Sequence, residues 1–189
     1  MLEGRYYDST DNSYIYIGNK ADYLSGVHTI QDQTKKVFDL GYGTNLLVYG
    51  SSSAKINKQQ KVLHLYQKEG KDRFVIHGGR LENWKIQFIG LPEEEIDAPQ
   101  AFNKNLITGC LTLLDLKAKN LDIKVDGARC EDGLNLIRVA GDINSLDISN
   151  TSRDAFDADF SNVKLGKINV VDAGNDCVDL SSGNYSIDY

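Results

Sequence analysis

The chain has 189 residues, enough for one domain with a continuous core, and it carries a net charge of −6. This acidic balance, with a pI near 5.0, leaves no basic surface for nucleic acid or for an anionic membrane. No stretch approaches the roughly 18 apolar residues of a membrane-spanning helix, and residues 1–13 lack the apolar core of a signal peptide. We therefore expect no nucleic acid as a partner and no insertion into a membrane.

Short apolar runs separated by Gly, Asn, Asp and Ser follow one another through the first half of the chain. They lie at 14–17, 36–40, 45–49, 61–66, 73–77 and 84–89. Runs of this length without a 3.6-residue period predict strands, and the residues between them suit tight turns. Because no repeat is visible in this half, we interpret residues 1–78 as an N-terminal cap with irregular first turns.

Aromatic residues are concentrated in the same half, where eight of the ten tyrosines lie between Tyr6 and Tyr66, and Trp84 follows. Such side chains stack on sugar rings when they stand in a row on an exposed sheet. Tyrosine is also common in strands, and we favour the interpretation that places these residues in the core and the cap.

The segment 91–105 interrupts the strands with both prolines of the chain and four acidic residues. This composition predicts a loop that bulges from one corner between turns. The loop is either a solvated insertion, which we favour, or the wall of a groove.

One six-residue pattern occurs three times in the second half, at a spacing of 22 residues: CEDGLN, SRDAFD and GNDCVD. The aligned positions are an Asp (Asp132, Asp154, Asp176), an apolar residue (Leu134, Phe156, Val178) and an Asn or Asp (Asn135, Asp157, Asp179). A unit of this length is too short for a strand–helix–strand crossover and cannot bury its apolar face alone, but stacked units can. The sequence therefore predicts an all-β fold, a parallel β-helix with about 22 residues per turn, whose regular turns occupy residues 79–189 and continue beyond the chain end.

Stacking places equivalent residues about 4.8 Å apart, so each aligned position forms a ladder. The apolar ladder is expected in the core and the Asn/Asp ladder on the outside. Leucine-rich repeats have a similar period, but their leucine and asparagine positions are absent here, and propeller blades are longer.

Cys110, Cys130 and Cys177 each lie beside apolar residues and lack the spacing of a metal site. Their odd number favours buried free thiols over a disulfide framework or a zinc site. The redox compartment stays open.

The segment from Leu106 to Tyr185 resembles the β-helix repeats of bacterial surface and secreted proteins, and the repeated D-small-apolar-[DN] step carries this resemblance. The resemblance implies a right-handed parallel β-helix and an extracellular or cell-surface setting within a longer chain. It does not imply one reaction.

A second resemblance is narrower: SRDAFD and NDCVDL are similar to the active-site turns of polygalacturonase-type glycoside hydrolases. It implies that Asp154 matches the first catalytic carboxylate and Asp176 the last. However, Asn175 stands where that family has its general acid, and without this acid the mechanism loses a factor of roughly 10² to 10⁴. Neighbouring turns alone give about 4.8 Å, so the two carboxyl groups reach the roughly 6.5 to 9.5 Å of an inverting pair only if their side chains diverge, which the geometry allows.

The alternative for Asp132, Asp154 and Asp176 is a structural ladder at one corner, in which each carboxylate accepts N–H groups of the residues that follow it. We favour this interpretation. No catalytic residue is then required.

Asp157, Asp159 and Asp179 form an outward acidic set. Stacked carboxylates repel one another, which raises a pKa or calls for a cation, and Ca²⁺ suits a cluster of oxygen ligands. No DxDxDG loop is present, and Lys or Arg could neutralise the charge instead. We expect no cofactor, with calcium at these three residues as the alternative.

These features together predict a non-catalytic β-helix module of a bacterial surface or secreted protein, acting as a rigid spacer or as a platform for polysaccharide or protein contact. The first alternative is a polysaccharide-degrading, inverting enzyme that uses Asp154 and Asp176. The second is an intracellular β-helix of purely structural role. An uncovered last turn exposes unpaired backbone groups, so we also expect either further turns after Tyr189 or end-to-end packing against another copy.

Overall fold

The computed structural model describes residues 4–8, 13–17, 35–92, 101, 103 and 107–188. The chain divides into two compact units, Met1–Gln33 and Thr34–Tyr189. In the first unit, β1 (Gly4–Asp8) and β2 (Ser13–Ile17) form an antiparallel hairpin. All further description concerns the second unit.

Every regular element among the described residues of the second unit is a β-strand. They are β3 (Lys35–Gly41), β4 (Thr44–Tyr49), β5 (Ser53–Asn57), β6 (Val62–Tyr66), β7 (Arg73–His77), β8 (Arg80–Glu82), β9 (Lys85–Ile89), β10 (Gly109–Leu114), β11 (Lys117–Asp126), β12 (Asp132–Ile137), β13 (Ala140–Thr151), β14 (Asp154–Asp159), β15 (Asn162–Ala173), β16 (Asp179–Ser181) and β17 (Asn184–Ile187). None of the described residues forms a helix that could cross a membrane.

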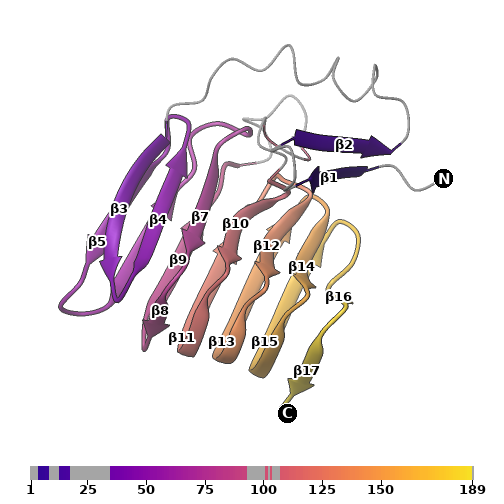
Figure 1. Cartoon of the computed structure of the whole chain (residues 1–189). Coiled ribbons are helices and arrows are strands. Elements are labelled where there is room, and N and C mark those ends of the chain that lie inside the picture. Colours follow the sequence, from indigo (N-terminus) through magenta and orange to yellow (C-terminus); the bar gives the residue numbers. More distant parts are fainter. Residues whose placement is uncertain are drawn as a thin grey trace. The chain divides into compact units, whose positions relative to one another are not determined.

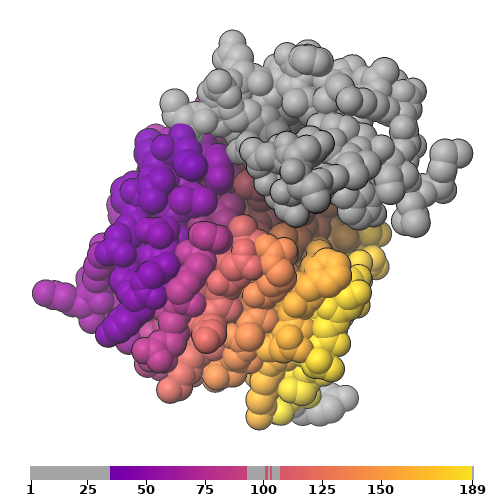
Figure 2. Space-filling model, in the orientation of Figure 1, coloured from indigo at the N-terminus to yellow at the C-terminus, as the bar shows by residue number. Residues whose placement is uncertain are grey.

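These strands form two sheets around one core (Figure 1). Sheet 1 has the order β16-β14-β12-β10-β7-β4-β3, and sheet 2 has the order β17-β15-β13-β11-β9-β6-β5, with β8 paired to β11. Each strand of sheet 1 from β10 onward is followed in the chain by a strand of sheet 2, so the chain winds in parallel coils of about 23 residues. The result is a β-solenoid of about five turns, which confirms the predicted stack of parallel coils. The coils are visible in Figure 2 as consecutive bands from indigo to yellow.

The inner ladder of sheet 1 consists of Leu111, Leu134 and Phe156, which are paired in register and fully buried. Because Asp157 pairs with Asp179, Val178 falls into the same column. Val178 is nevertheless 37% exposed, since no described coil covers it.

Residues with a left-handed backbone recur at the corners. One corner holds Asp115, Arg138, Phe160 and Ser182, all with φ between 46° and 52°, one in each coil. This conformation reverses the chain sharply at the same place in successive coils. The neighbouring coil requires a glycine at position 141, because a Cβ there would clash with the carbonyl oxygen of Ala118.

The first strands depart from the parallel pattern. In sheet 1, β4 is antiparallel to both β3 and β7, and in sheet 2, β5 is antiparallel to β6. Parallel pairing starts with β10 on β7 and with β9 on β6. Irregular first strands are therefore present in residues 35–66.

Cys110 and Cys130 form a disulfide, so the expectation of buried free thiols is wrong for this pair. The two residues are 20 positions apart, close to one coil length, so the winding of the chain brings their Cα atoms to 5.4 Å. The odd number of cysteines did not predict this disulfide, because only the coil period shows which two cysteines become neighbours. Cys177 is free, and it is exposed rather than buried.

Candidate functional site

The outer face of sheet 1 carries a row of acidic side chains on its last three coils. We call Asp132, Asn135, Asp157, Asp159 and Asp179 the acidic ladder. Asn135, Asp157 and Asp179 are in register on β12, β14 and β16. They lie on the face of sheet 1 opposite to the buried inner ladder. The exposure of the side chains increases along this column: Asn135 is buried, Asp157 is half-buried and Asp179 is exposed.

Hydrogen bonds link the coils within the acidic ladder. Nδ2 of Asn135 donates to Oδ2 of Asp132 and to Oδ2 of Asp157, both at 3.0 Å, and lies 3.2 Å from Oγ1 of Thr108. The other amide atom, Oδ1 of Asn135, is buried and has no hydrogen-bond partner in the described part of the chain.

The electrostatic environment favours the neutral form of three carboxyl groups in the acidic ladder, those of Asp132, Asp157 and Asp159. Loss of solvation raises the pKa of Asp157 to about 7, with further increases from Asp132, Asp159 and Asp179. Burial and the charge of Asp179 raise the pKa of Asp159 as well. Burial also raises the pKa of Asp132. Asp157 can therefore hold a proton near neutral pH.

Metal binding at Asp157, Asp159 and Asp179 stays a prediction. Among the described residues, no group of three His, Cys, Asp or Glu side chains has the geometry to hold a metal ion. A proton on Asp157 relieves part of the repulsion that would otherwise call for a cation.

The corner aspartates differ from one another in their surroundings. Asp132 is buried and pairs in register with Asp154, which is half-buried, whereas Asp176 is exposed. Oδ1 of Asp154 accepts the backbone N–H of Asp176 at 3.0 Å and Nδ2 of Asn175 at 2.6 Å. The bonds run to the next coil and not to the residues that follow within the same turn, so Asp154 fastens the last coil to its neighbour.

The outer face of sheet 2 contains a hollow of about 370 Å³ that the sequence did not single out. We call it the sheet-2 hollow. Its lining comes from β6, β9, β11 and β13: Val62, His64, Lys85, Ile86, Gln87, Asp122, Ile123, Lys124, Ser145 and Asp147. The only sequence feature that relates to this hollow is the alternation of polar and apolar residues in KIQFI and LDIKVD. This alternation is typical of any half-buried strand, so it does not indicate a site.

One row of polar side chains crosses this hollow in register: His64, Gln87, Lys124 and Asp147. Nζ of Lys124 lies 3.7 Å from Oδ2 of Asp147. His64 also stacks on Tyr66, with ring centroids 6.3 Å apart. The row presents donors and acceptors on successive coils.

Asp122 forms the second polar element of the hollow. Its Oδ1 accepts hydrogen bonds from Oγ of Ser145 and Nδ2 of Asn144, both at 2.7 Å. Two donors from the neighbouring coil thus fix the orientation of this carboxylate.

The aromatic residues give no exposed row in the described part of the second unit. Trp84 is buried in the core, and Tyr66 is half-buried. The tyrosines before residue 35 have side chains outside the described set, and most of segment 91–105 is outside it too.

The fold and these two surfaces define the chain as a β-solenoid. Comparison with protein-family models, with curated proteins and with solved structures gave no match.

Proposed function

We propose that this chain is a non-catalytic β-solenoid module that binds an extended glycan along the sheet-2 hollow. The observation that carries the proposal is the row of polar side chains that four neighbouring strands place across one shallow depression. A ligand lying along the solenoid axis would meet a new polar group about every 4.8 Å.

The chemistry of the lining suits sugars, whose hydroxyl groups both donate and accept hydrogen bonds. Asp122 and Asp147 accept, Lys85 and Lys124 donate, and Gln87 does both. Val62, which is partly exposed, contributes apolar surface beside them. Lys124 already pairs with Asp147, so Lys85 is the cation that would pair with a carboxylate of an acidic glycan.

Rigidity supports a binding role because a preformed surface loses little entropy when a ligand binds. Continuous parallel pairing and the Cys110–Cys130 disulfide both hold the coils in place. A disulfide persists in oxidising compartments, and it therefore supports placing the protein outside the cell or on its surface. The assignment to bacterial surface proteins depends on the repeat resemblance alone.

Affinity electrophoresis through gels that contain polygalacturonate or dextran tests the proposal. We expect polygalacturonate to retard the wild-type chain and the substitutions Lys124→Ala and Gln87→Ala to weaken the retardation. Lys117→Ala is the matched control, because it removes the same charge from an exposed position of the same strand outside the hollow. Absence of retardation by either polymer, or an equal effect of Lys117→Ala, would refute glycan binding at this site.

Hydrolysis of a polysaccharide is the second candidate function, and Asp157 is the observation in its favour. With a pKa of about 7 and Asp179 in register beside it, Asp157 could donate a proton while another carboxylate activates water. Release of reducing ends from polygalacturonate, lost in Asp157→Asn, would support this function. Loss in Asp154→Asn and Asp176→Asn, with Asp157→Asn still active, would support the pair that the sequence suggested.

A further inference from the structure

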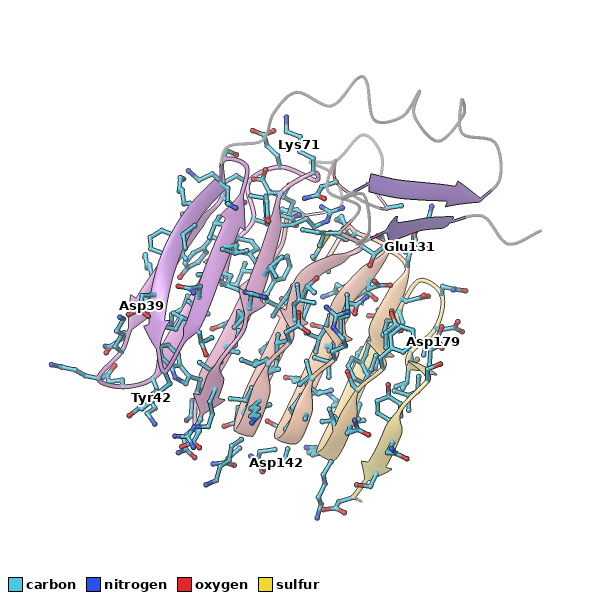
Figure 3. All side chains as sticks on the ribbon, viewed as in Figure 1. Asp39, Tyr42, Lys71, Glu131, Asp142 and Asp179 are labelled. Atoms are coloured by element: carbon cyan, nitrogen blue, oxygen red, sulfur yellow. A yellow bond between two sulfur atoms is a disulfide. The ribbon has the colours of Figure 1, made fainter. Side chains whose placement is uncertain are left out.

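The two ends of the solenoid carry opposite charges. Residues 35–61, which form the first strands, contain five lysines and one aspartate, a net charge of +4. Residues 174–188, which form the last coil with β16 and β17, contain three aspartates and neither lysine nor arginine, a net charge of −3. One of the three, Asp188, pairs with Lys164 of the preceding coil, so within the described residues Asp176 and Asp179 carry the unpaired charge of this end. Figure 3 shows Asp39 and Asp179 at the two opposite ends of the stack.

Each end also presents two open strand edges. Among the described residues, β3 and β16 are the outermost strands of sheet 1, and β5 and β17 are the outermost strands of sheet 2. Within the described residues each of these four strands pairs on one side only, so its other side offers backbone N–H and C=O groups to an additional strand.

Apolar side chains accompany these edges. Val178 and Ile187 on the last coil are 37% and 49% exposed, and Val37 on β3 is 56% exposed. Phe38 and Ile56 at the first end, and Leu180 and Tyr185 at the last, pack on the core while staying partly exposed. Contact between the two ends would bury apolar surface from both.

We propose that the last coil of one molecule docks on the first strands of a second copy, with β16 beside β3 and β17 beside β5. Charge selects this arrangement: two basic ends repel each other, as do two acidic ends, whereas a basic and an acidic end attract. The contact is head to tail, and repetition of such a contact gives an open filament. The inference does not depend on the proposed glycan binding.

Sedimentation velocity of the chain over a concentration series tests this contact. At low salt we expect the mass to increase with concentration. In about 1 M salt, where the electrostatic screening length is about 3 Å, we expect mainly monomer.

Two double variants test which ends meet. Lys35→Glu with Lys55→Glu reverses charge on both basic edge strands, and Asp176→Lys with Asp179→Lys reverses it on the acidic coil. All four side chains are exposed, so both variants should fold. Each variant alone should sediment as a monomer, while an equimolar mixture should associate again because opposite charges then meet at the ends.

Circular dichroism melts of both variants confirm that loss of association is not loss of folding. A wild-type chain that stays monomeric at low salt would overturn the proposal. Association that survives both reversals would place the contact elsewhere. Loss of association in the acidic-coil variant alone would indicate pairing of two last coils and would also overturn it.

Discussion

The side-chain amide of Asn135 donates a hydrogen bond to the carboxylate of Asp157 in the next coil, at 3.0 Å. The same nitrogen lies 3.0 Å from the carboxylate of Asp132. One neutral amide thus stands between two acidic groups and offsets only part of their repulsion. Loss of solvation is the main cause that raises the pKa of Asp157 to about 7, and the charges of Asp132, Asp159 and Asp179 raise it further.

Stability should therefore depend on the proton of Asp157. Its pKa in the folded chain is raised above the ordinary value of 3.8, so the folded state binds more protons between these two values. This contribution is fully present below about pH 4 and is lost as the pH rises through about 7. Asp157→Asn imitates the neutral form and should stabilise the chain at pH 8, by about 1 kcal/mol after allowance for solvent screening.

Urea unfolding at pH 5 and pH 8 measures this difference. Asp172→Asn is the control, because it removes one negative charge from an exposed site outside the acidic ladder. If the unfolding free energies of the wild type and of Asp157→Asn change by the same amount between the two pH values, the raised pKa does not belong to Asp157.

The inner ladder gives a second test, in which two phenylalanines of the same coil serve as a matched pair. Phe156 is fully buried, whereas Phe160 is 62% exposed. Phe156→Ala should cost about 3–5 kcal/mol, as large-to-small changes in a packed core do. Phe160→Ala should change the unfolding free energy by less than about 0.5 kcal/mol. Equal losses in chemical denaturation would mean that the column is not a core ladder.

The sequence predicted the stacked coils because the period of the repeat determines which residues become neighbours. Leu134 and Phe156 are 22 positions apart and pair in register, as expected for one coil. The period could not show that Val178, in the same column, would be exposed, because exposure depends on what covers the last coil. It was also uninformative about the first strands, which pair antiparallel and carry no repeat.

The sheet-2 hollow was missed for a different reason. Its side chains belong to strands that look like ordinary half-buried strands, and they form a site only through the alignment of separate coils. Gln87 and Lys124 are paired neighbours although segment 91–105 separates them in the sequence. An insertion between two repeats obscures their register until the pairing is known.

Asp154 and Asp176 should respond differently to substitution, although the sequence treats them as equivalent. Asp154→Ala removes the acceptor for the backbone N–H of Asp176 and should cost about 1 kcal/mol, while Asp154→Asn keeps an oxygen there and should cost less. The side chain of Asp176 is exposed, so Asp176→Ala should change stability by less than about 0.5 kcal/mol. Thermal unfolding of the three variants at one pH measures the order. Similar losses for Asp154→Ala and Asp176→Ala would contradict the fastening role of Asp154.

The disulfide gives the last prediction, which concerns both thiol chemistry and stability. A thiol reagent should count one reactive cysteine in the folded chain, the exposed Cys177, and three after reduction in denaturant. Reduction of Cys110–Cys130 should lower the unfolding free energy by about 3 kcal/mol, because the bond closes a loop of moderate length in the unfolded chain. Cys110→Ala with Cys130→Ala should show a similar loss and no response to reductant, whereas Cys177→Ala should respond like the wild type. Three reactive thiols in a chain purified without reductant would show that the bond does not form, and would remove the support it gives to an extracellular setting.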